Sequence, residues 1–186
     1  MAEVGTYKFK QYTYEEVIEK IKTYIHNEKD LALIEKAYLF AYEMHKNQYR
    51  KSGEAYIFHP LCVTQKLSSL HVGPNTLIAG LLHDVVEDTD TTVEDLKNMF
   101  NEDVAQIVDG VTKVTKLQFA SLEKQQVSNH QKMLLAMAKD IRVIVVKLCD
   151  RLHNMRTLDF MPVEKQVRIA KETLEIYLDF CLLSYV

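Results

Sequence analysis

Apolar residues recur at helical spacing along most of the chain. In residues 13–26, apolar side chains stand at offsets of one, four and eight from Val17, which places them on one face of a helix. Thr13 and Glu16 precede that face with the spacing of a capping box. Residues 30–50 continue the three-and-four spacing. The two segments therefore predict two amphipathic helices near the N-terminal end.

The rest of the chain continues the helical pattern, interrupted by polar segments. The expected helices cover residues 60–70, 76–88, 93–100, 102–114, 130–140, 141–158 and 162–185. Residues 51–60, 71–75 and 115–129 are expected loops, because they are polar, contain Gly or Pro, or lack periodicity. The alternative for residues 115–129 is a helix end that becomes ordered only with ligand. Residues 141–146 alone would suit a strand, but no second strand is available to pair with them. The pattern predicts an all-α fold, a compact multi-helix bundle with residues 1–186 as a single domain.

Composition narrows the function classes. The chain has 186 residues, 47% of them hydrophobic, and a formal net charge of −3. The absence of a basic excess argues against a general nucleic-acid surface. Cys62, Cys149 and Cys181 are odd in number and lack a C-x-x-C pair, which predicts small buried hydrophobic residues in a reducing compartment. With no apolar leader and no segment long enough to cross a membrane, we expect a cytoplasmic protein without membrane or nucleic-acid partners.

A histidine and three acids stand close together in residues 83–88. Residues four apart share a helix face, so His83 with Glu87 and Asp84 with Asp88 would form neighbouring ridges. A solvated helix end explains Glu87 and Asp88 but not His83 and Asp84, which directly follow an apolar run. A buried carboxylate without a partner is unfavourable, and a metal ion removes that penalty. The segment therefore indicates a metal site.

Two further residues complete a set of metal ligands. His59 stands next to the start of an expected helix, and Asp150 stands in the middle of another. Taken alone, His59 is more often a structural or surface histidine. Together with His83 and Asp84, the set offers two imidazole nitrogens and two carboxylates without sulfur. Such a set suits manganese, iron or zinc with open coordination positions, and it fits a phosphate-ester hydrolase better than a structural zinc site.

Residues 141–158 carry two stripes at helical spacing. The apolar stripe consists of Val145, Leu148, Leu152 and Met155. The polar stripe consists of Lys147, Asp150, Asn154 and Thr157. A polar stripe is usually solvated, but this one follows an apolar run, so we expect it to line a half-buried cleft. In that cleft, Lys147 either adds positive charge to a substrate pocket or is a surface lysine.

The order of these ligands, a histidine, a His-Asp pair and a later aspartate, resembles the signature of the HD superfamily of metal-dependent phosphohydrolases. The surrounding segments resemble the hydrolase domain of the Rel/SpoT family, which cleaves the guanosine alarmones (p)ppGpp and releases pyrophosphate from the 3′ position. The matching segments are RKSGEAYIFHP, AGLLHDVVEDTDTT, IVDGVTKVTKL, VVKLCDRLHNMRTL and RIAKETLEIY. The resemblance runs from the second expected helix to Tyr177.

The resemblance implies roles for individual residues. The implied metal ligands are His59, His83, Asp84 and Asp150. The implied metal is manganese, with another divalent ion as the alternative. Glu87 and Asp88 match an acidic pair, of which one member orients or deprotonates the attacking water. The implied substrate-binding residues are Arg50, Lys51, Ser52, Asn154, Thr157 and Arg168, and the implied partner is a guanosine nucleotide, ppGpp or pppGpp.

Other functions fit parts of the pattern. One alternative is phosphohydrolysis of another nucleotide, such as a dNTP, a cyclic nucleotide or NADPH. The other is a non-catalytic regulatory HD module, against which the intact ligand set argues. No synthetase motif is present, so we expect either a stand-alone hydrolase or the hydrolase-only part of a longer enzyme. Tyr56 is expected near the nucleotide base, and the remaining histidines are expected outside the site, namely His26, His45, His71, His130 and His153.

Overall fold

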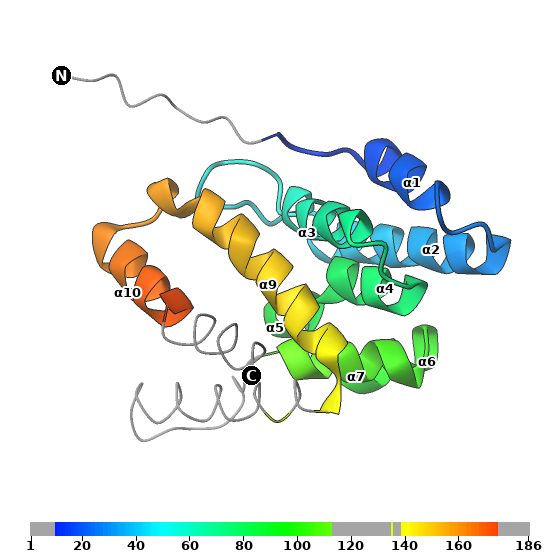
Figure 1. Ribbon diagram of the computed structural model, residues 1–186. Coiled ribbons are helices and arrows are strands. Elements are labelled where there is room, and N and C mark those ends of the chain that lie inside the picture. The colour runs from blue at the N-terminus through cyan, green and yellow to red at the C-terminus, as the bar shows by residue number, and fades with distance from the viewer. Residues whose placement is uncertain (1–9, 113–134, 136–138, 175–186) are drawn as a thin grey trace, which may run out of the picture.

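The computed structural model describes residues 10–112, 135 and 139–174, and helices dominate it (Figure 1). The helices are α1 (Tyr14–Lys22), α2 (Glu28–Met44), α3 (Phe58–Ser69), α4 (Pro74–Leu82), α5 (Val85–Asp88), α6 (Val93–Met99), α7 (Glu102–Val111), α9 (Ile141–Arg156), the 3-10 helix η1 (Leu158–Phe160) and α10 (Val163–Thr173). Within the described ranges no β-strand forms, and extended pairing is limited to an isolated bridge between Tyr49 and Ala55. The prediction of an all-α bundle is confirmed.

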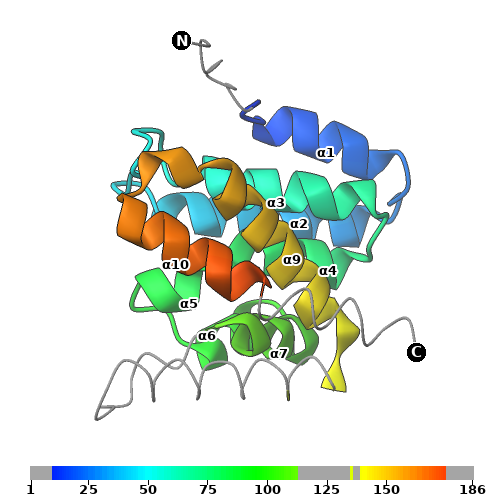
Figure 2. The same cartoon turned by 60° about the vertical axis from the view of Figure 1, so that its left-hand side comes forward.

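Helix α4 forms the centre of the bundle. It packs against α2, α3, α7 and α9, and α3 lies on one side of it and α7 on the other (Figures 1 and 2). Every residue from 76 to 82 is buried, as expected for a helix that is apolar all round. A Cβ atom added to Gly80 would stand 2.4 Å from Cδ1 of Leu67 in α3. Glycine at this position therefore lets α3 and α4 approach closely.

Helix α9 packs against α3, α4 and α7 and buries much of its polar stripe. Lys147 and Asp150 are only 8% and 5% exposed, which confirms the expected burial of that stripe and shows that the reading of Lys147 as a surface residue is wrong. The apolar stripe is partly open, because Leu148 and Leu152 are 37% and 42% exposed. The apolar residues that α9 buries are Val143, Ile144, Val146 and Cys149.

Several helix boundaries differ from the sequence prediction. The helix expected over 30–50 ends at Met44, and α3 begins at Phe58 rather than at Pro60, so His59 lies in its first turn. The helix expected over 76–88 is divided into α4 and α5, with His83 and Asp84 between them. The reading of these two residues as members of one continuous helix is therefore wrong. Tertiary contacts of both side chains accompany the break.

Some sequence predictions fall wholly or partly outside the described residues. These are the loop over 115–129, most of the helix over 130–140, the second half of the helix over 162–185 and Cys181. Cys62 and Cys149 are free and buried, as predicted. The helices in the described part of the chain are all too short or too polar to cross a membrane. The assignment of residues 1–186 to one domain stays a prediction.

Candidate metal centre

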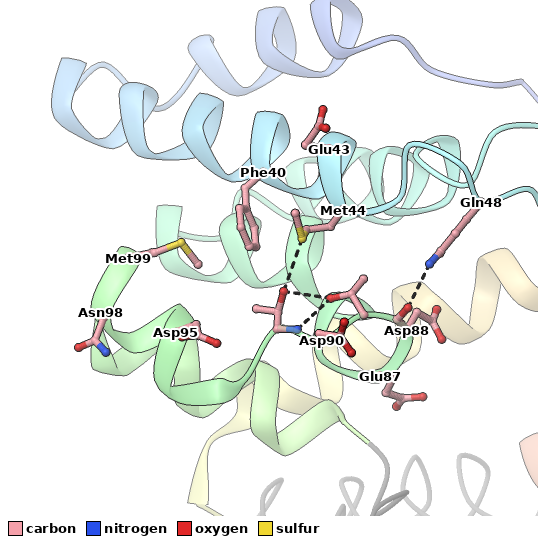
Figure 3. Close-up of a pocket in the computed structure, with 12 residues that line it drawn as sticks. Phe40, Glu43, Met44, Gln48, Glu87, Asp88, Asp90, Asp95, Asn98 and Met99 are labelled. Atoms are coloured by element: carbon pink, nitrogen blue, oxygen red, sulfur yellow. Dashed lines mark hydrogen bonds between the residues drawn. The ribbon is translucent and has the colours of Figure 1, made fainter.

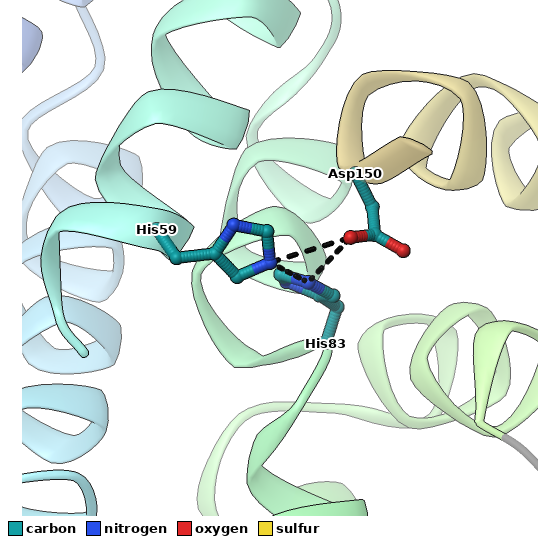
Figure 4. Close-up of side chains that lie close together, drawn as sticks. All are labelled: His59, His83 and Asp150. Carbon is teal, nitrogen blue, oxygen red and sulfur yellow. Dashed lines mark hydrogen bonds and ion pairs between the residues drawn. The ribbon is translucent and has the colours of Figure 1, made fainter. Parts of the chain in front are cut away.

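Four side chains from separate elements converge beside α4. His59 comes from the first turn of α3, His83 from the end of α4, Asp84 from the turn before α5, and Asp150 from the middle of α9. Ligand atoms of His59, His83 and Asp150 all lie within 4.8 Å of one another, and all three residues are buried. Figure 4 shows the two imidazoles and this carboxylate turned toward one another. The packing of helices around α4 therefore brings together residues that are far apart in the sequence.

The fourth side chain lies against the same two histidines. Oδ2 of Asp84 is 3.2 Å from Nε2 of His83 and 3.3 Å from Nε2 of His59. Oδ1 of Asp150 is 3.3 Å from Nε2 of His59 and 3.8 Å from Nε2 of His83. Consecutive side chains on a continuous helix point about 100° apart. The turn between α4 and α5 instead brings His83 and Asp84 to one point.

The donor set fits a divalent ion. The two Nε2 atoms of His59 and His83 lie 3.2 Å apart. Nitrogen and oxygen ligands that surround one tetrahedral ion at about 2.1 Å are roughly 3.4 Å from one another, which is close to the 3.2–3.8 Å between the facing atoms of His59, His83 and Asp150. Asp84 contacts both imidazoles but lies outside this three-residue group. Asp150 is only 5% exposed, and a buried carboxylate calls for a neighbouring positive charge. Imidazole and carboxylate together suit zinc, manganese or iron.

A backbone carbonyl orients His83. Nδ1 of His83 lies 2.9 Å from the carbonyl oxygen of Gly80. The carbonyl can only accept, so Nδ1 carries the hydrogen, and in the neutral ring Nε2 keeps its lone pair facing the cluster. A hydrogen bond of this kind from the distal ring nitrogen is typical of histidines that bind metals. Gly80 thus serves both helix packing and the site.

A second histidine contacts His59. Nδ1 of His59 lies 2.8 Å from Nδ1 of His153, so the expectation that His153 lies outside the site is wrong. Burial, together with the neighbouring positive charges of His59 and Arg50, lowers the pKa of His153 to about 3. His153 is three residues after Asp150, and this spacing on one helix face was the signal in the sequence.

The electrostatics of the cluster keep its carboxylates ionised. Burial alone would lower the pKa of His83, but Asp84 and Asp150 outweigh it and raise the pKa to about 10. Burial opposes ionisation of Asp84 and Asp150 as well, yet the histidines, and Lys147 for Asp150, hold both carboxyl pKa values well below their usual range. The cluster therefore presents two ionised carboxylates, and a cation that binds there would displace the Nε2 proton of His83.

Neighbouring side chains hold each carboxylate in place. Oη of Tyr56 donates to Oδ2 of Asp84 at 2.7 Å. Burial and the charges of Asp84 and Asp88 raise the pKa of Tyr56, which keeps its phenol a donor. Nζ of Lys147 lies 3.1 Å from Oδ2 of Asp150, and Nδ2 of Asn154 donates to Oδ1 of Asp150 at 2.5 Å. Tyr56 thus contacts Asp84, and its predicted approach to a nucleotide base stays a prediction.

Arg50 lies beside this cluster, within a loop closed by its own hydrogen bonds. Nη2 of Arg50 donates to Oδ1 of Asn154 at 2.8 Å and to Oγ1 of Thr157 at 3.3 Å. The amide of Arg50 donates to the carbonyl of Glu54, and the amide of Gly53 donates to the carbonyl of Arg50, each at 2.9 Å. Gly53 has a φ of +91°, which suits glycine. Three of the predicted substrate-binding residues therefore meet.

The other predicted substrate-binding residues are placed less directly. Lys51 is exposed and Ser52 half-buried, both within the same turn as Arg50. Arg168 is exposed on α10, and among the described contacts none joins it to the cluster. The structure therefore brings together Arg50, Asn154 and Thr157 and leaves Arg168 apart.

The predicted acidic pair lies on α5, at the edge of a cavity. Glu87 and Asp88 line a cavity of about 950 Å³, which Figure 3 shows with Phe40 and Met44 on its far side. Nε2 of Gln48 donates to the backbone carbonyl of Asp88 at 3.0 Å. Burial and the charge of Asp84 raise the pKa of Asp88. A carboxylate with a raised pKa is suited to accept a proton near neutral pH.

Comparisons with known proteins show which family and which relatives the chain resembles. The HD domain family matches residues 37–181. The chain is 52% identical over 155 residues to a GTP pyrophosphokinase of Myxococcus xanthus, covering 82% of this chain and 20% of that protein. It is 51% identical over 166 residues to a guanosine-3′,5′-bis(diphosphate) 3′-pyrophosphohydrolase of Spiroplasma citri, covering 88% and 22%. The chain thus spans about a fifth of the length of these relatives.

A solved structure is similar over most of both chains. It is described as a metazoan ortholog of SpoT that hydrolyzes ppGpp and plays a role in starvation responses. The TM-score is 0.64 at 29% sequence identity, and the match covers 77% of this chain and 84% of the other. The fold of most of this chain therefore has a counterpart of known structure.

Proposed function

The chain belongs to the HD domain family, and we propose that it hydrolyses (p)ppGpp to GDP or GTP and pyrophosphate. The observation that carries this proposal is the convergence of His59, His83, Asp84 and Asp150, with Arg50 held next to it by Asn154. The Spiroplasma relative, whose name states this activity, and the ppGpp-hydrolysing structural relative support it. A cytoplasmic location and a guanosine nucleotide as partner are part of the proposal.

The four converging side chains would hold the divalent ion, for which we propose manganese. When bound, such an ion acidifies water and neutralises charge on phosphate oxygens. Neighbouring residues orient the side chains that would bind the ion. Gly80 directs Nε2 of His83 inward, and Lys147 and Asn154 hold the two oxygens of Asp150. The carboxylate positions are therefore set before the substrate arrives.

We assign the attacking water's proton to the acidic pair. Within the pair we assign this role to Asp88, because burial and the charge of Asp84 raise its pKa above the ordinary value. Tyr56 donates a hydrogen bond to Asp84 and also contacts Asp88, where its hydrogen bond opposes the rise in pKa. Tyr56 therefore orders this side of the site. The reaction breaks the bond between the 3′ oxygen and the diphosphate, and the 3′ oxygen takes up a proton as pyrophosphate leaves.

The substrate is a polyanion that must approach several carboxylates, so it needs nearby cations. Arg50 supplies a guanidinium whose Cζ lies 5.8 Å from the ring centroid of Tyr56. A planar guanidinium can stack on a purine or pair with phosphate oxygens. We propose that Arg50, Lys51 and Ser52 meet the nucleoside and that Arg168 reaches its phosphates. Lys147 contributes positive charge through Asp150.

Incubation of the protein with ppGpp and Mn(II), with and without excess chelator, tests the proposal. We expect GDP and pyrophosphate in equal amounts, and no product with chelator. A dNTP, a cyclic nucleotide and NADPH run in parallel test the alternative hydrolase functions. Turnover of one of these nucleotides with ppGpp left intact would overturn the proposal, and so would binding of ppGpp without turnover under all metals tried.

A further inference from the structure

We infer that His153 is a positioning residue that accepts a hydrogen bond from Nδ1 of His59, so that the lone pair on Nε2 of His59 is free to bind a cation. This inference rests on the proposed function, because it concerns the same centre. The carrying observation is the 2.8 Å hydrogen bond between Nδ1 of His59 and Nδ1 of His153. The two ring centroids lie 4.8 Å apart, and His59 is 1% exposed.

Two arrangements of the hydrogen are available to this bond. A neutral imidazole carries one N–H and one lone pair. If His153 donates, His59 accepts at Nδ1 and carries its hydrogen at Nε2, which cannot then bind a cation. If His59 donates, its Nε2 keeps the lone pair and faces Asp84 and Asp150 at 3.3 Å. The proposed centre requires the second arrangement, with His153 as acceptor.

Different groups accept the Nδ1 hydrogen of the two histidines of the centre. His83 donates to the carbonyl of Gly80, a group that can only accept, so the backbone alone settles its hydrogen. His59 stands in the first turn of α3, and its Nδ1 faces a side chain of α9 instead. The orientation of His59 therefore depends on a residue that can be substituted, whereas that of His83 does not.

His153 reaches His59 from α9 and also lines a cavity of about 290 Å³ together with Lys66 and Arg156. In the arrangement that the centre requires, His153 carries its own hydrogen at Nε2 and accepts at Nδ1. The hydrogen bond from His59 is then complete.

Two substitutions at position 153 distinguish the effect of the hydrogen-bond acceptor from the effect of side-chain volume. In His153→Asn the side-chain carbonyl oxygen takes roughly the place of Nδ1 and keeps an acceptor. In His153→Leu the volume is similar, but no acceptor is left. We expect His153→Leu to weaken Mn(II) affinity about 10- to 100-fold, the range typical for losing a hydrogen-bond partner of a metal ligand. We expect His153→Asn to stay within about threefold of wild type, by the same reasoning.

The measurement is a titration of the full chain with Mn(II) in the absence of nucleotide, in which the electron paramagnetic resonance signal reports the free ion. His26→Leu, at an exposed position, is the matched control for the His-to-Leu change and should bind as wild type does. Thermal unfolding in chelator checks that each variant is folded, and His153→Met replaces His153→Leu if the latter is not.

The outcomes separate this inference from the function on which it rests. If the wild type binds Mn(II) and His153→Leu binds equally well, the positioning role is overturned while the metal centre stands. If His153→Asn is as weak as His153→Leu, the acceptor is not what His153 contributes, and the inference is again overturned. If the wild type itself binds no divalent ion, the metal centre and the role of His153 are both refuted.

Discussion

Nδ1 of His83 donates a hydrogen bond to the carbonyl oxygen of Gly80 at 2.9 Å, within the same stretch of α4 that packs most closely on α3. The glycine therefore contributes its carbonyl to the site and its missing side chain to the core. Any change that pushes α4 away from α3 also moves the imidazole. Packing and metal binding are coupled through this one residue.

Gly80→Ala should destabilise the fold. The new Cβ would stand 2.4 Å from Cδ1 of Leu67 and 3.2 Å from Oγ1 of Thr64, so side chains or helices must shift. Overpacking of this kind costs about 1–3 kcal/mol of unfolding free energy, measurable by urea denaturation. Combining it with Leu67→Ala makes room for the methyl group. The double variant should then lose less unfolding free energy than the two single variants lose in sum. Strict additivity would contradict the clash.

His83→Ala and Asp84→Ala should each abolish ppGpp hydrolysis while the fold is kept. Each change removes a side chain whose ligand atom lies within 3.3 Å of Nε2 of His59. We expect a fall in kcat of at least about 10³-fold, because the cation and the water that it acidifies are lost together. Circular dichroism checks the helical content. Wild-type turnover in either variant would show that the cluster is not the catalytic centre.

A divalent ion should stabilise the protein against unfolding. Binding to the folded state alone adds about 2.7 kcal/mol when the free ion is at 100 times its Kd. Thermal melts with increasing Mn(II) should therefore show a rising Tm, and excess chelator should remove the shift. Asp150→Asn should lose the shift, whereas Asp159→Asn, an exposed carboxylate on η1, should retain it. A shift of equal size in both variants would indicate non-specific binding.

Arg50→Met should raise KM for ppGpp more than it lowers kcat. Arg50 contacts Asn154 and Thr157 rather than the metal ligands themselves, so its loss weakens binding and leaves the reacting groups in place. We expect a rise in KM of about tenfold, equivalent to one charge-assisted contact of roughly 1.4 kcal/mol. Lys46→Met, which removes an exposed cation outside the site, is the control. A loss confined to kcat would contradict a binding role.

The ion-pair network of Asp103 and Arg142 should make stability depend on pH. Nη1 and Nη2 of Arg142 donate to the two oxygens of Asp103 at 2.7 and 2.5 Å, and this contact lowers the carboxyl pKa. A carboxyl pKa that is lower in the folded state contributes stability above the unfolded pKa of about 3.9, and that contribution is lost as pH falls through the folded pKa.

Arg142→Met should therefore destabilise the protein at pH 7, and the difference from wild type should shrink toward pH 3. Both side chains are more than a third exposed, so solvent screening limits the effect at pH 7 to about 1 kcal/mol. Urea denaturation of wild type and variant at the two pH values measures it. A difference that stays constant from pH 7 to pH 3 would show that Arg142 acts through packing rather than charge.

The parts of the fold that depend on local periodicity could be predicted from the sequence. The capping box at Thr13 forms as expected, and α4 is buried all round because every residue in its latter part is apolar or small. The polar stripe of α9 is buried as the apolar run before it indicated. In these cases the prediction depends only on residues that are close together along one helix.

The parts that depend on contacts between helices could not be predicted. The break between α4 and α5 is invisible to a helical pattern, because both sides of it remain apolar and helical. The partnership of His59 and His153 depends on how α3 and α9 cross, 94 residues apart in sequence. For the same reason the sequence pattern alone left Lys147 ambiguous, because its burial depends on the helices that pack against α9.

The turn that carries Arg50 has a thermodynamic consequence for ligand recognition. Hydrogen bonds at both ends of residues 50–54, and a glycine at the position with positive φ, hold this turn in one shape in the free protein. The turn loses its conformational entropy when the protein folds, so the binding of a nucleotide does not have to compensate for that loss. Association should then resemble the fitting of rigid surfaces, and Gly53 influences affinity without touching the ligand.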